Sequence, residues 1–181
     1  MRLIIVRHGE TDSNHAGIIM GQRLDDPLNQ TGRKQAEAAA RELQKAGIDT
    51  ILASSLRRAR ETAEIISQAI GVPVVCRDEL KERDFGGLSG KRWDELDEPS
   101  GGKAKELFQK DQNQEYDYRP WGGESVGDVK ARLEKIIGEA KRSGGTVLLV
   151  AHGGILRLMH HLVHKETIAK PQNASIHEFV L

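Results

Sequence analysis

Three short polar runs in the sequence combine histidine, arginine and glycine in a way that packing alone does not require. They are Arg7-His8-Gly9, Ser54-Ser55-Leu56-Arg57-Arg58 and His152-Gly153-Gly154, and each directly follows an apolar stretch. A single histidine in such a place is most often structural. Two histidines, each followed by glycine and accompanied by arginine, are hard to explain as packing. The three runs are therefore candidates for one shared site.

Such a set of residues suits the transfer of a phosphoryl group. The planar guanidinium of arginine offers donors in a fixed geometry that matches phosphate oxygens. A neutral imidazole can act as the nucleophile, and neighbouring cations favour that neutral form. The sequence contains neither a G-x-x-x-x-G-K-[ST] loop for nucleotide phosphates nor an acidic cluster spaced for magnesium. We therefore expect a reaction that needs no metal and no cofactor.

The apolar stretches predict the strands that would bring these runs together. Residues 3–6, 50–53, 72–76 and 146–151 have the length and β-branched content of strands that are buried on both faces. In open parallel sheets, ligands bind beyond the carboxyl ends of the strands. Three of the predicted strands end at the polar runs, so the candidate residues would meet at that edge of the sheet.

Helical patterns alternate with these strands. Thr31 can cap a helix that reaches about Ala46, a second helix runs from about Leu56 to Ile70, and a capping box at residues 125–128 opens a third. Crossover helices of this length predict an α/β fold, a three-layer α/β/α sandwich with a mostly parallel central sheet. Residues 176–181 could add an edge strand. The polar segment 88–123, which contains Pro99, Gly101 and Gly102, reads as an irregular excursion with one or two short helices.

Bulk properties exclude several classes of protein. The 181 residues fit a single domain, 1–181. Formal net charge is zero and the pI is about 7.1, so no whole-molecule field attracts nucleic acid or an anionic membrane. The apolar stretches are too short to cross a bilayer, and Cys76, the single cysteine, is expected to be a small buried hydrophobic residue. These properties predict a cytoplasmic protein with a small-molecule partner.

Five ordered motifs resemble those of the histidine phosphatase superfamily, also called the phosphoglycerate mutase-like family. R-H-G-E-T-D-S-N at residues 7–14 is similar to its R-H-G-E-[ST]-x-x-N signature. Further matches are Gly21-Gln22 with L-N-Q-T-G at 28–32, S-S-L-R-R-A-R-E-T at 54–62, L-K-E-R-D-F-G at 80–86 and V-A-H-G-G at 150–154. The resemblance spans nearly the whole chain and implies the phosphoglycerate mutase-like fold.

The resemblance also implies roles for individual residues. His8 would be the nucleophile that accepts the phosphoryl group, with Arg7, Arg58 and His152 completing the phosphate pocket. Glu82 would be the proton donor, which later deprotonates the attacking water. Asn14, Gln22 and Gly153 would contact the phosphate or the substrate.

Other residues have simpler interpretations. His160 and His164 have a spacing that can bind zinc, but no glutamate, cysteine or carboxylate set completes a site, so no metal is expected there. The aromatic residues of the excursion could line a pocket lid or pack beneath a long loop, and both interpretations stay open: Trp93, Tyr116, Tyr118 and Trp121.

The expected activity is that of a histidine acid phosphatase, a phosphomonoester hydrolase acting on a small metabolite such as α-ribazole phosphate, phosphoserine or a sugar phosphate. A cofactor-dependent phosphoglycerate mutase is the main alternative, because it would use the same histidine. A catalytically silent binding protein on the same fold is the third. Mutases of the family have longer chains with larger insertions, whereas this compact chain resembles the small phosphatases. Its length therefore favours the phosphatase.

Overall fold

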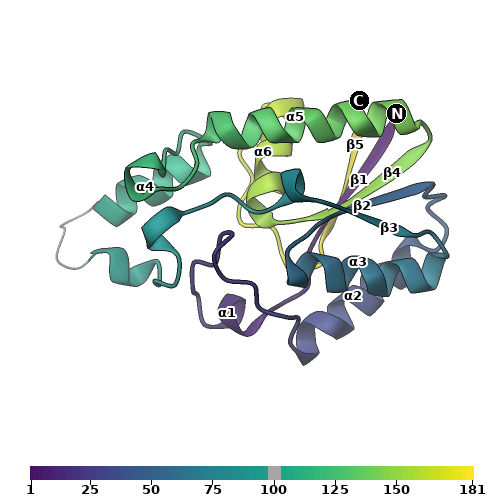
Figure 1. Ribbon diagram of the computed structural model, residues 1–181, viewed down its shortest axis with the longest axis horizontal. Coiled ribbons are helices and arrows are strands. Elements are labelled where there is room, and N and C mark those ends of the chain that lie inside the picture. Colours follow the sequence, from purple (N-terminus) through teal and green to yellow (C-terminus); the bar gives the residue numbers. More distant parts are fainter. Residues whose placement is uncertain (98–102) are drawn as a thin grey trace.

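The computed structural model describes residues 1–97 and 103–181 and has a five-stranded sheet at its centre (Figure 1). The strand order is β3-β2-β4-β1-β5. The strands are β1 (Arg2–Arg7), β2 (Thr50–Ser54), β3 (Val74–Arg77), β4 (Thr146–Ala151) and β5 (Ile176–Val180). Pairing is parallel except between β1 and β5, which is antiparallel. The predicted mostly parallel sheet and the terminal edge strand are both confirmed.

Helices cover both faces of the sheet, as predicted for an α/β/α sandwich. Helices α2 (Gln30–Leu43) and α3 (Arg57–Ile70) pack on one face, and α5 (Val126–Ser143) and α6 (Gly153–His164) pack on the other. Their apolar stripes bury against alternate residues of the strands, which is why the central strands read as continuous apolar runs. Helix α1 (Asp12–His15) lies in the loop after β1.

The excursion after β3 projects to one end of the molecule (Figure 1). It holds α4 (Lys103–Gln112) and the 3₁₀ helices η3 (Asp94–Asp97) and η4 (Arg119–Trp121). The 3₁₀ helices η1 (Asp78–Leu80) and η2 (Gly86–Leu88) lead into it. The segment therefore has more helix than predicted. Residues 98–102, with Pro99, Gly101 and Gly102, lie outside the described residues.

Two sequence-based expectations about local structure are wrong. Cys76 is exposed, because β3 is an edge strand whose residues are only half-buried or exposed, whereas burial on both faces was predicted. Asn29, not Thr31, caps α2: its side-chain oxygen accepts a hydrogen bond from the Gly32 N–H at 2.8 Å. The predicted capping box at the start of α5, between Ser125 and Asp128, is confirmed.

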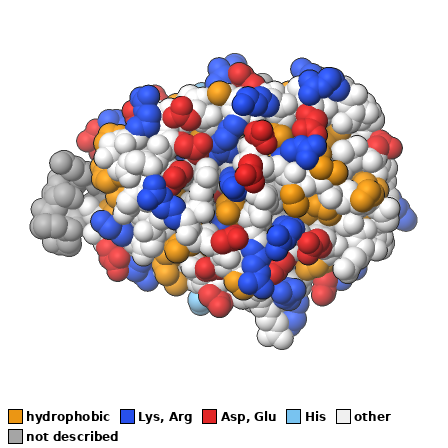
Figure 2. Space-filling model, in the orientation of Figure 1, with side chains coloured by type: hydrophobic (Ala, Val, Ile, Leu, Met, Phe, Trp, Pro, Cys, Tyr) orange, Lys and Arg blue, Asp and Glu red, His pale blue; other side chains and the backbone are white. Residues whose placement is uncertain are grey.

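The surface carries no large patch of one charge sign on the face drawn in Figure 2, where basic and acidic side chains alternate. This distribution agrees with the zero net charge of the chain. Among the helices that the structure describes, none is both long and apolar enough to cross a membrane.

Candidate active site

His8 lies at the carboxyl end of β1 and is 3% exposed. Its Nδ1 is 2.7 Å from the carbonyl oxygen of Gly9. Because a carbonyl only accepts hydrogen bonds, Nδ1 must carry the proton, and the lone pair of the neutral ring is on Nε2. Burial lowers the pKa of His8 well below its ordinary value, and the charges of Arg58 and Arg7 lower it further. The structure therefore presents a neutral imidazole with a nucleophilic Nε2.

The backbone of His8 is fixed by segments from distant parts of the chain. Its N–H donates to the carbonyl of Ala151 at 2.9 Å, and its carbonyl accepts from the Ala174 N–H at 3.2 Å. The Asn173 Nδ2 also donates to this carbonyl, at 3.0 Å, and to the Asn14 Oδ1 at 3.2 Å. No sequence motif pointed to Asn173, which joins β1 to the segment that precedes β5.

Arg7 and Arg58 are buried beside His8, as the motifs predicted. The Arg58 guanidinium donates to the carbonyls of Leu24 at 3.0 Å and Gly21 at 2.8 Å, and that of Arg7 donates to the carbonyl of Pro171. Burial lowers the pKa of Arg7 to about 10 and also lowers that of Arg58, so both remain charged at neutral pH. Among residues 1–97 and 103–181, neither buried Nε has a hydrogen-bond partner, which leaves donors for an anion.

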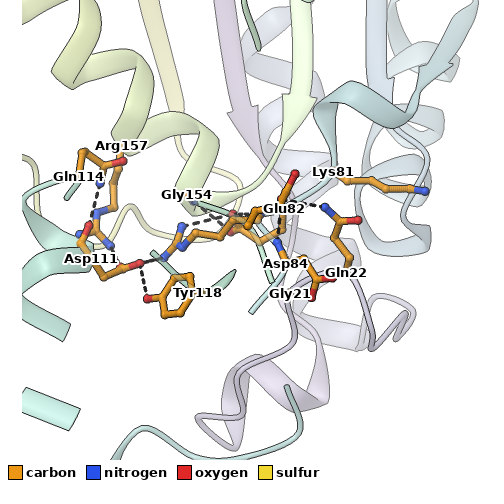
Figure 3. Close-up of polar contacts among 12 residues, drawn as sticks. Gly21, Gln22, Lys81, Glu82, Asp84, Asp111, Gln114, Tyr118, Gly154 and Arg157 are labelled. Atoms are coloured by element: carbon orange, nitrogen blue, oxygen red, sulfur yellow. Dashed lines mark hydrogen bonds and ion pairs between the residues drawn. The ribbon is translucent and has the colours of Figure 1, made fainter. Parts of the chain in front are cut away.

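Glu82 enters the same pocket from the loop after η1 (Figure 3). One carboxylate oxygen accepts the Gly154 N–H at 3.0 Å, and the other accepts from the N–H of Arg83 at 2.9 Å and from its guanidinium at 3.3 Å. Burial raises the pKa of Glu82, but the Arg83 charge and these two N–H groups together outweigh it, so the pKa is lowered. Glu82 is therefore ionised in the free site.

His152 follows β4, and its ring centroid is 5.1 Å from that of His8. Its Nε2 is 2.8 Å from the Ser54 Oγ, and its buried Nδ1 has no hydrogen-bond partner in the part of the chain that the structure describes. The motifs predicted His152 in the phosphate pocket, but it lies behind His8 and is not among the residues that line the pocket. Burial lowers its pKa well below the ordinary value, and Arg58 adds to that effect. Ser54 opens one of the sequence motifs but was not identified as a site residue. The register of the sheet explains why Ser54 contacts His152, because β2 and β4 are adjacent parallel strands that end together.

The remaining predicted residues divide into two groups. Asn14, in α1, and Gly153, the first residue of α6, line the pocket together with Arg7, His8, Arg58 and Glu82. Gln22 does not line it: its Nε2 donates to the Glu124 carboxylate at 3.0 Å.

A cluster of buried charges extends the pocket toward α4 and was not predicted (Figure 3). Asp111, 1% exposed, forms ion pairs with Arg83 at 2.7 Å and Arg157 at 2.9 Å and accepts the Tyr118 hydroxyl at 2.9 Å. Arg83, Asp111, Arg157 and Lys170 all line the pocket. Asp111 lies in the polar run K-D-Q-N-Q-E, whose composition is typical of a solvated surface.

Some aromatic residues of the excursion line the pocket, and others pack beneath the loop. Trp93 lines the pocket with Phe85 and Phe108, and its ring lies 5.7 Å and 5.6 Å from theirs. Tyr116 and Tyr118 are fully buried and their rings stack at 5.4 Å, so they pack beneath the loop, while the Tyr118 hydroxyl also donates to Asp111.

The histidines near the end of α6 do not make a metal site in the part of the chain that the structure describes. The Nε2 of His160 is 2.9 Å from the Nδ1 of His177, and the ring of His164 is 5.5 Å from that of His160. No group of three or more metal-ligating side chains is found among residues 1–97 and 103–181.

Comparison with known proteins places this geometry in a family. Residues 3–180 match the family described as Histidine phosphatase superfamily (branch 1). A metal-independent phosphoserine phosphatase from Arabidopsis thaliana is 36% identical, with the alignment covering 96% of this chain and 74% of that protein. A 2,3-bisphosphoglycerate-dependent phosphoglycerate mutase from a Methylobacterium species is 35% identical over 87% of this chain and 77% of its own.

A solved structure gives the same result for the fold. The mycobacterial glucosyl-3-phosphoglycerate phosphatase in complex with VO3 superposes with a TM-score of 0.87 at 32% identity, covering 98% of this chain and 91% of that one. The motifs, the fold and these matches agree, and the chain belongs to the histidine phosphatase superfamily, branch 1.

Proposed function

We propose that the protein hydrolyses phosphate monoesters of small metabolites through a phosphohistidine on His8. The observation that carries the proposal is the hydrogen bond from His8 Nδ1 to Gly9, which leaves the Nε2 lone pair free beside two arginines. An uncharged nucleophile surrounded by fixed cations suits attack on an anionic ester.

The residues of the pocket supply each step of this reaction. The Nε2 of His8 attacks phosphorus while Arg7 and Arg58 hold the equatorial oxygens. The negative charge of the bound phosphate raises the pKa of Glu82, so the carboxyl can carry the proton that it gives to the leaving oxygen. Water then attacks the phosphohistidine, Glu82 takes the proton of that water, and inorganic phosphate and free His8 result.

The relatives favour hydrolysis but also supply the alternative. Two of the proteins named above are phosphatases, and one is a phosphoglycerate mutase that depends on 2,3-bisphosphoglycerate. A mutase would return the phosphoryl group from His8 to a bound sugar acid rather than to water. Release of inorganic phosphate distinguishes the two reactions.

The experiment is to mix the enzyme with a ³²P-labelled phosphate ester, denature it in alkali and map the label. We expect acid-labile phosphate on His8, phosphate release that persists in EDTA, and a fall in turnover of roughly 10³ to 10⁶ in His8→Ala. His15→Ala, which removes an exposed histidine of α1, is the matched control and should retain activity. Loss of turnover in EDTA that a divalent ion restores would contradict the proposed mechanism.

A further inference from the structure

Arg83 bridges two buried carboxylates, and only one of them, Glu82, has a role in the proposed reaction. The Arg83 Nη1 lies 3.3 Å from the Glu82 Oε1, and its Nη2 lies 2.7 Å from the Asp111 Oδ1. The exposed fraction of the side chain is 6% for Arg83, 14% for Glu82 and 1% for Asp111. Because little water screens charges at such depth, a change of charge on one of the three groups acts on the other two.

The guanidinium of Arg83 is held in one position by its surroundings. It lies over the ring of Phe85, 4.7 Å from the centroid, and 5.2 Å from the ring centroid of Tyr116. A Cβ on Gly154, in the first turn of α6, would overlap both the Arg83 guanidinium and the Glu82 carboxylate. Because Gly154 has no side chain, this ion pair can lie directly against the start of the helix.

The two oxygens of Glu82 have different hydrogen-bond partners. Oε1 accepts from Arg83 twice, from the backbone N–H at 2.9 Å and from Nη1 at 3.3 Å, whereas Oε2 accepts from the Gly154 N–H at 3.0 Å. An oxygen that faces a fixed cation binds a proton less readily, so Oε2 would carry the proton for the leaving group. In the transfer, the Oε2–H bond and the bond from phosphorus to the leaving oxygen break, the bond from His8 Nε2 to phosphorus forms, and the alcohol departs neutral.

We propose that Asp111 is a positioning residue for this general acid: it holds the Arg83 guanidinium against Oε1 and sets how much positive charge acts on Glu82. This inference rests on the proposed phosphatase function. Asp111 also pairs with Arg157 at 2.9 Å and accepts the Tyr118 hydroxyl at 2.9 Å. One carboxylate therefore compensates two arginines in part, and Arg83 keeps some of its charge for Glu82.

Removal of Arg83 and removal of Asp111 should change the acid in opposite directions. Burial raises the pKa of Glu82, but the Arg83 charge and the N–H groups outweigh it, so Arg83→Met should raise this pKa. Asp111→Asn leaves the Arg83 charge less compensated and should lower the pKa further. Six other charged or titratable groups surround Glu82 and are the same in both variants: Arg7, His8, Arg58, Tyr116, Arg132 and Lys170. A purely structural role of Asp111 would not produce opposite shifts.

The experiment measures the first step by rapid quench as a function of pH, with benzyl phosphate and p-nitrophenyl phosphate. Release of benzyl alcohol needs protonated Glu82, so its rate should fall as the pH rises through the pKa of Glu82, whereas release of p-nitrophenolate should fall far less. For benzyl phosphate, Arg83→Met should move this fall to a pH about one unit higher, and Asp111→Asn to a pH about half a unit lower or more. Asp111→Asn should have a smaller effect in the Arg83→Met background, because the connecting charge is gone.

Tyr118→Phe is the matched control, because it removes a hydrogen bond to Asp111 without changing a charge. It should keep the wild-type pH dependence. Circular dichroism at the assay temperature shows whether each variant is folded. Asp111→Ser, which leaves room for water beside the two arginines, takes the place of Asp111→Asn if that variant does not fold, and it should also move the fall to lower pH.

Two outcomes would overturn the proposal directly: the same pH dependence with and without the Asp111 carboxylate, or shifts in the same direction for Arg83→Met and the Asp111 variant. Rates that drop equally for both esters without a shift would assign Asp111 to stability alone. A wild-type protein with the same pH dependence for both esters would reject the proposal, because Glu82 would not be the acid, and would leave the phosphatase function standing. Absence of both hydrolysis and labelling of His8 would mean that the proposed function itself has failed.

Discussion

The two histidines of the site have different hydrogen-bond partners, and this difference gives them different chemistry. His8 donates from Nδ1 to a carbonyl, so its Nε2 is a lone pair. The Ser54 hydroxyl accepts from the Leu56 N–H and can donate its own proton to the Nε2 of His152. That arrangement places the remaining proton of His152 on Nδ1, for which the described residues offer no hydrogen-bond partner. The neutral His8 ring therefore keeps a lone pair at the pocket, whereas His152 is fully buried behind it and does not line the pocket.

Glu82 gives a prediction at the scale of one residue. An alkoxide leaving group needs a proton, for which general acid catalysis contributes about 10² to 10⁴, whereas p-nitrophenolate leaves readily without one. Glu82→Gln keeps the size of the side chain but cannot donate that proton. The variant should therefore slow the burst of leaving group from an alkyl phosphate far more than the burst from p-nitrophenyl phosphate, measured by rapid quench.

The first step must be observed by itself, because Glu82 would also activate the water that attacks phosphohistidine. Steady-state turnover could then fall for both substrates. Asp84→Asn is the matched control: this neighbouring carboxylate pairs with the exposed Arg23 and does not line the pocket. Equal burst losses for the two substrates in Glu82→Gln would remove Glu82 as the acid.

At the scale of elements, the buried carboxylate of Asp111 ties α4 to the site by ion pairs. Asp111 compensates two buried arginines, one next to Glu82 and one on α6. Removing one partner of a buried ion pair typically costs about 3 to 5 kcal/mol, because the other charge stays buried and unpaired. Asp111→Ala should therefore lower the free energy of unfolding by about that amount in urea denaturation.

Asn113→Ala, an exposed position in the turn after α4, is the control for Asp111→Ala and should change stability by less than about 0.5 kcal/mol. A loss below about 1 kcal/mol in Asp111→Ala would mean that solvent reaches both arginines once the carboxylate is gone. In that case α4 would not depend on the ion pairs for its position.

Element geometry also explains the two glycines at the contact between α2 and the loop after β1. A Cβ on Gly32, in the first turn of α2, would overlap the backbone of Glu10, and one on Gly9 would overlap the carbonyl of Gly32. The start of α2 therefore rests directly on the loop that carries His8. Both glycines lie in the sequence motifs, but the steric need for glycine at these positions is seen only in the structure, where the two backbones are in contact.

Over the whole molecule, the sequence predicted the central strands and the edge of the sheet at which the site lies, because both depend on local hydrophobic pattern. Three of the strands were predicted correctly because they are central and apolar. Their carboxyl ends bring His8 and Arg58 to the pocket and His152 next to His8. Cys76 was misread because a short apolar stretch looks the same in an edge strand as in a central one. Asp111 and Lys170 lie in polar segments, where only the path of the chain determines whether a charge faces the pocket.

The burial of His8 and His152 predicts how the stability of the whole molecule depends on pH. Both have pKa values well below the ordinary value in the folded protein, so they stay neutral there, whereas in the unfolded chain they titrate near pH 6.5. Below that pH the unfolded state binds more protons, so stability is lost as the pH falls. Each histidine should cost about 1.4 kcal/mol at pH 5.5, or about 3 kcal/mol together relative to pH 7.5.

Urea denaturation at pH 7.5 and pH 5.5 measures this difference, since pH 5.5 lies above the ordinary titration range of carboxyl groups. The variant His8→Asn/His152→Asn should lose most of the pH dependence, because asparagine does not titrate. Exposed His15→Asn is the control and should keep the wild-type difference. Burial also lowers the pKa values of His160 and His177, so a smaller dependence of the same sign should remain in the double variant. Equal stability of the wild-type protein at the two pH values would mean that the buried imidazoles accept protons in the folded state, and His8 would then not be the neutral nucleophile that its hydrogen bond to Gly9 indicates.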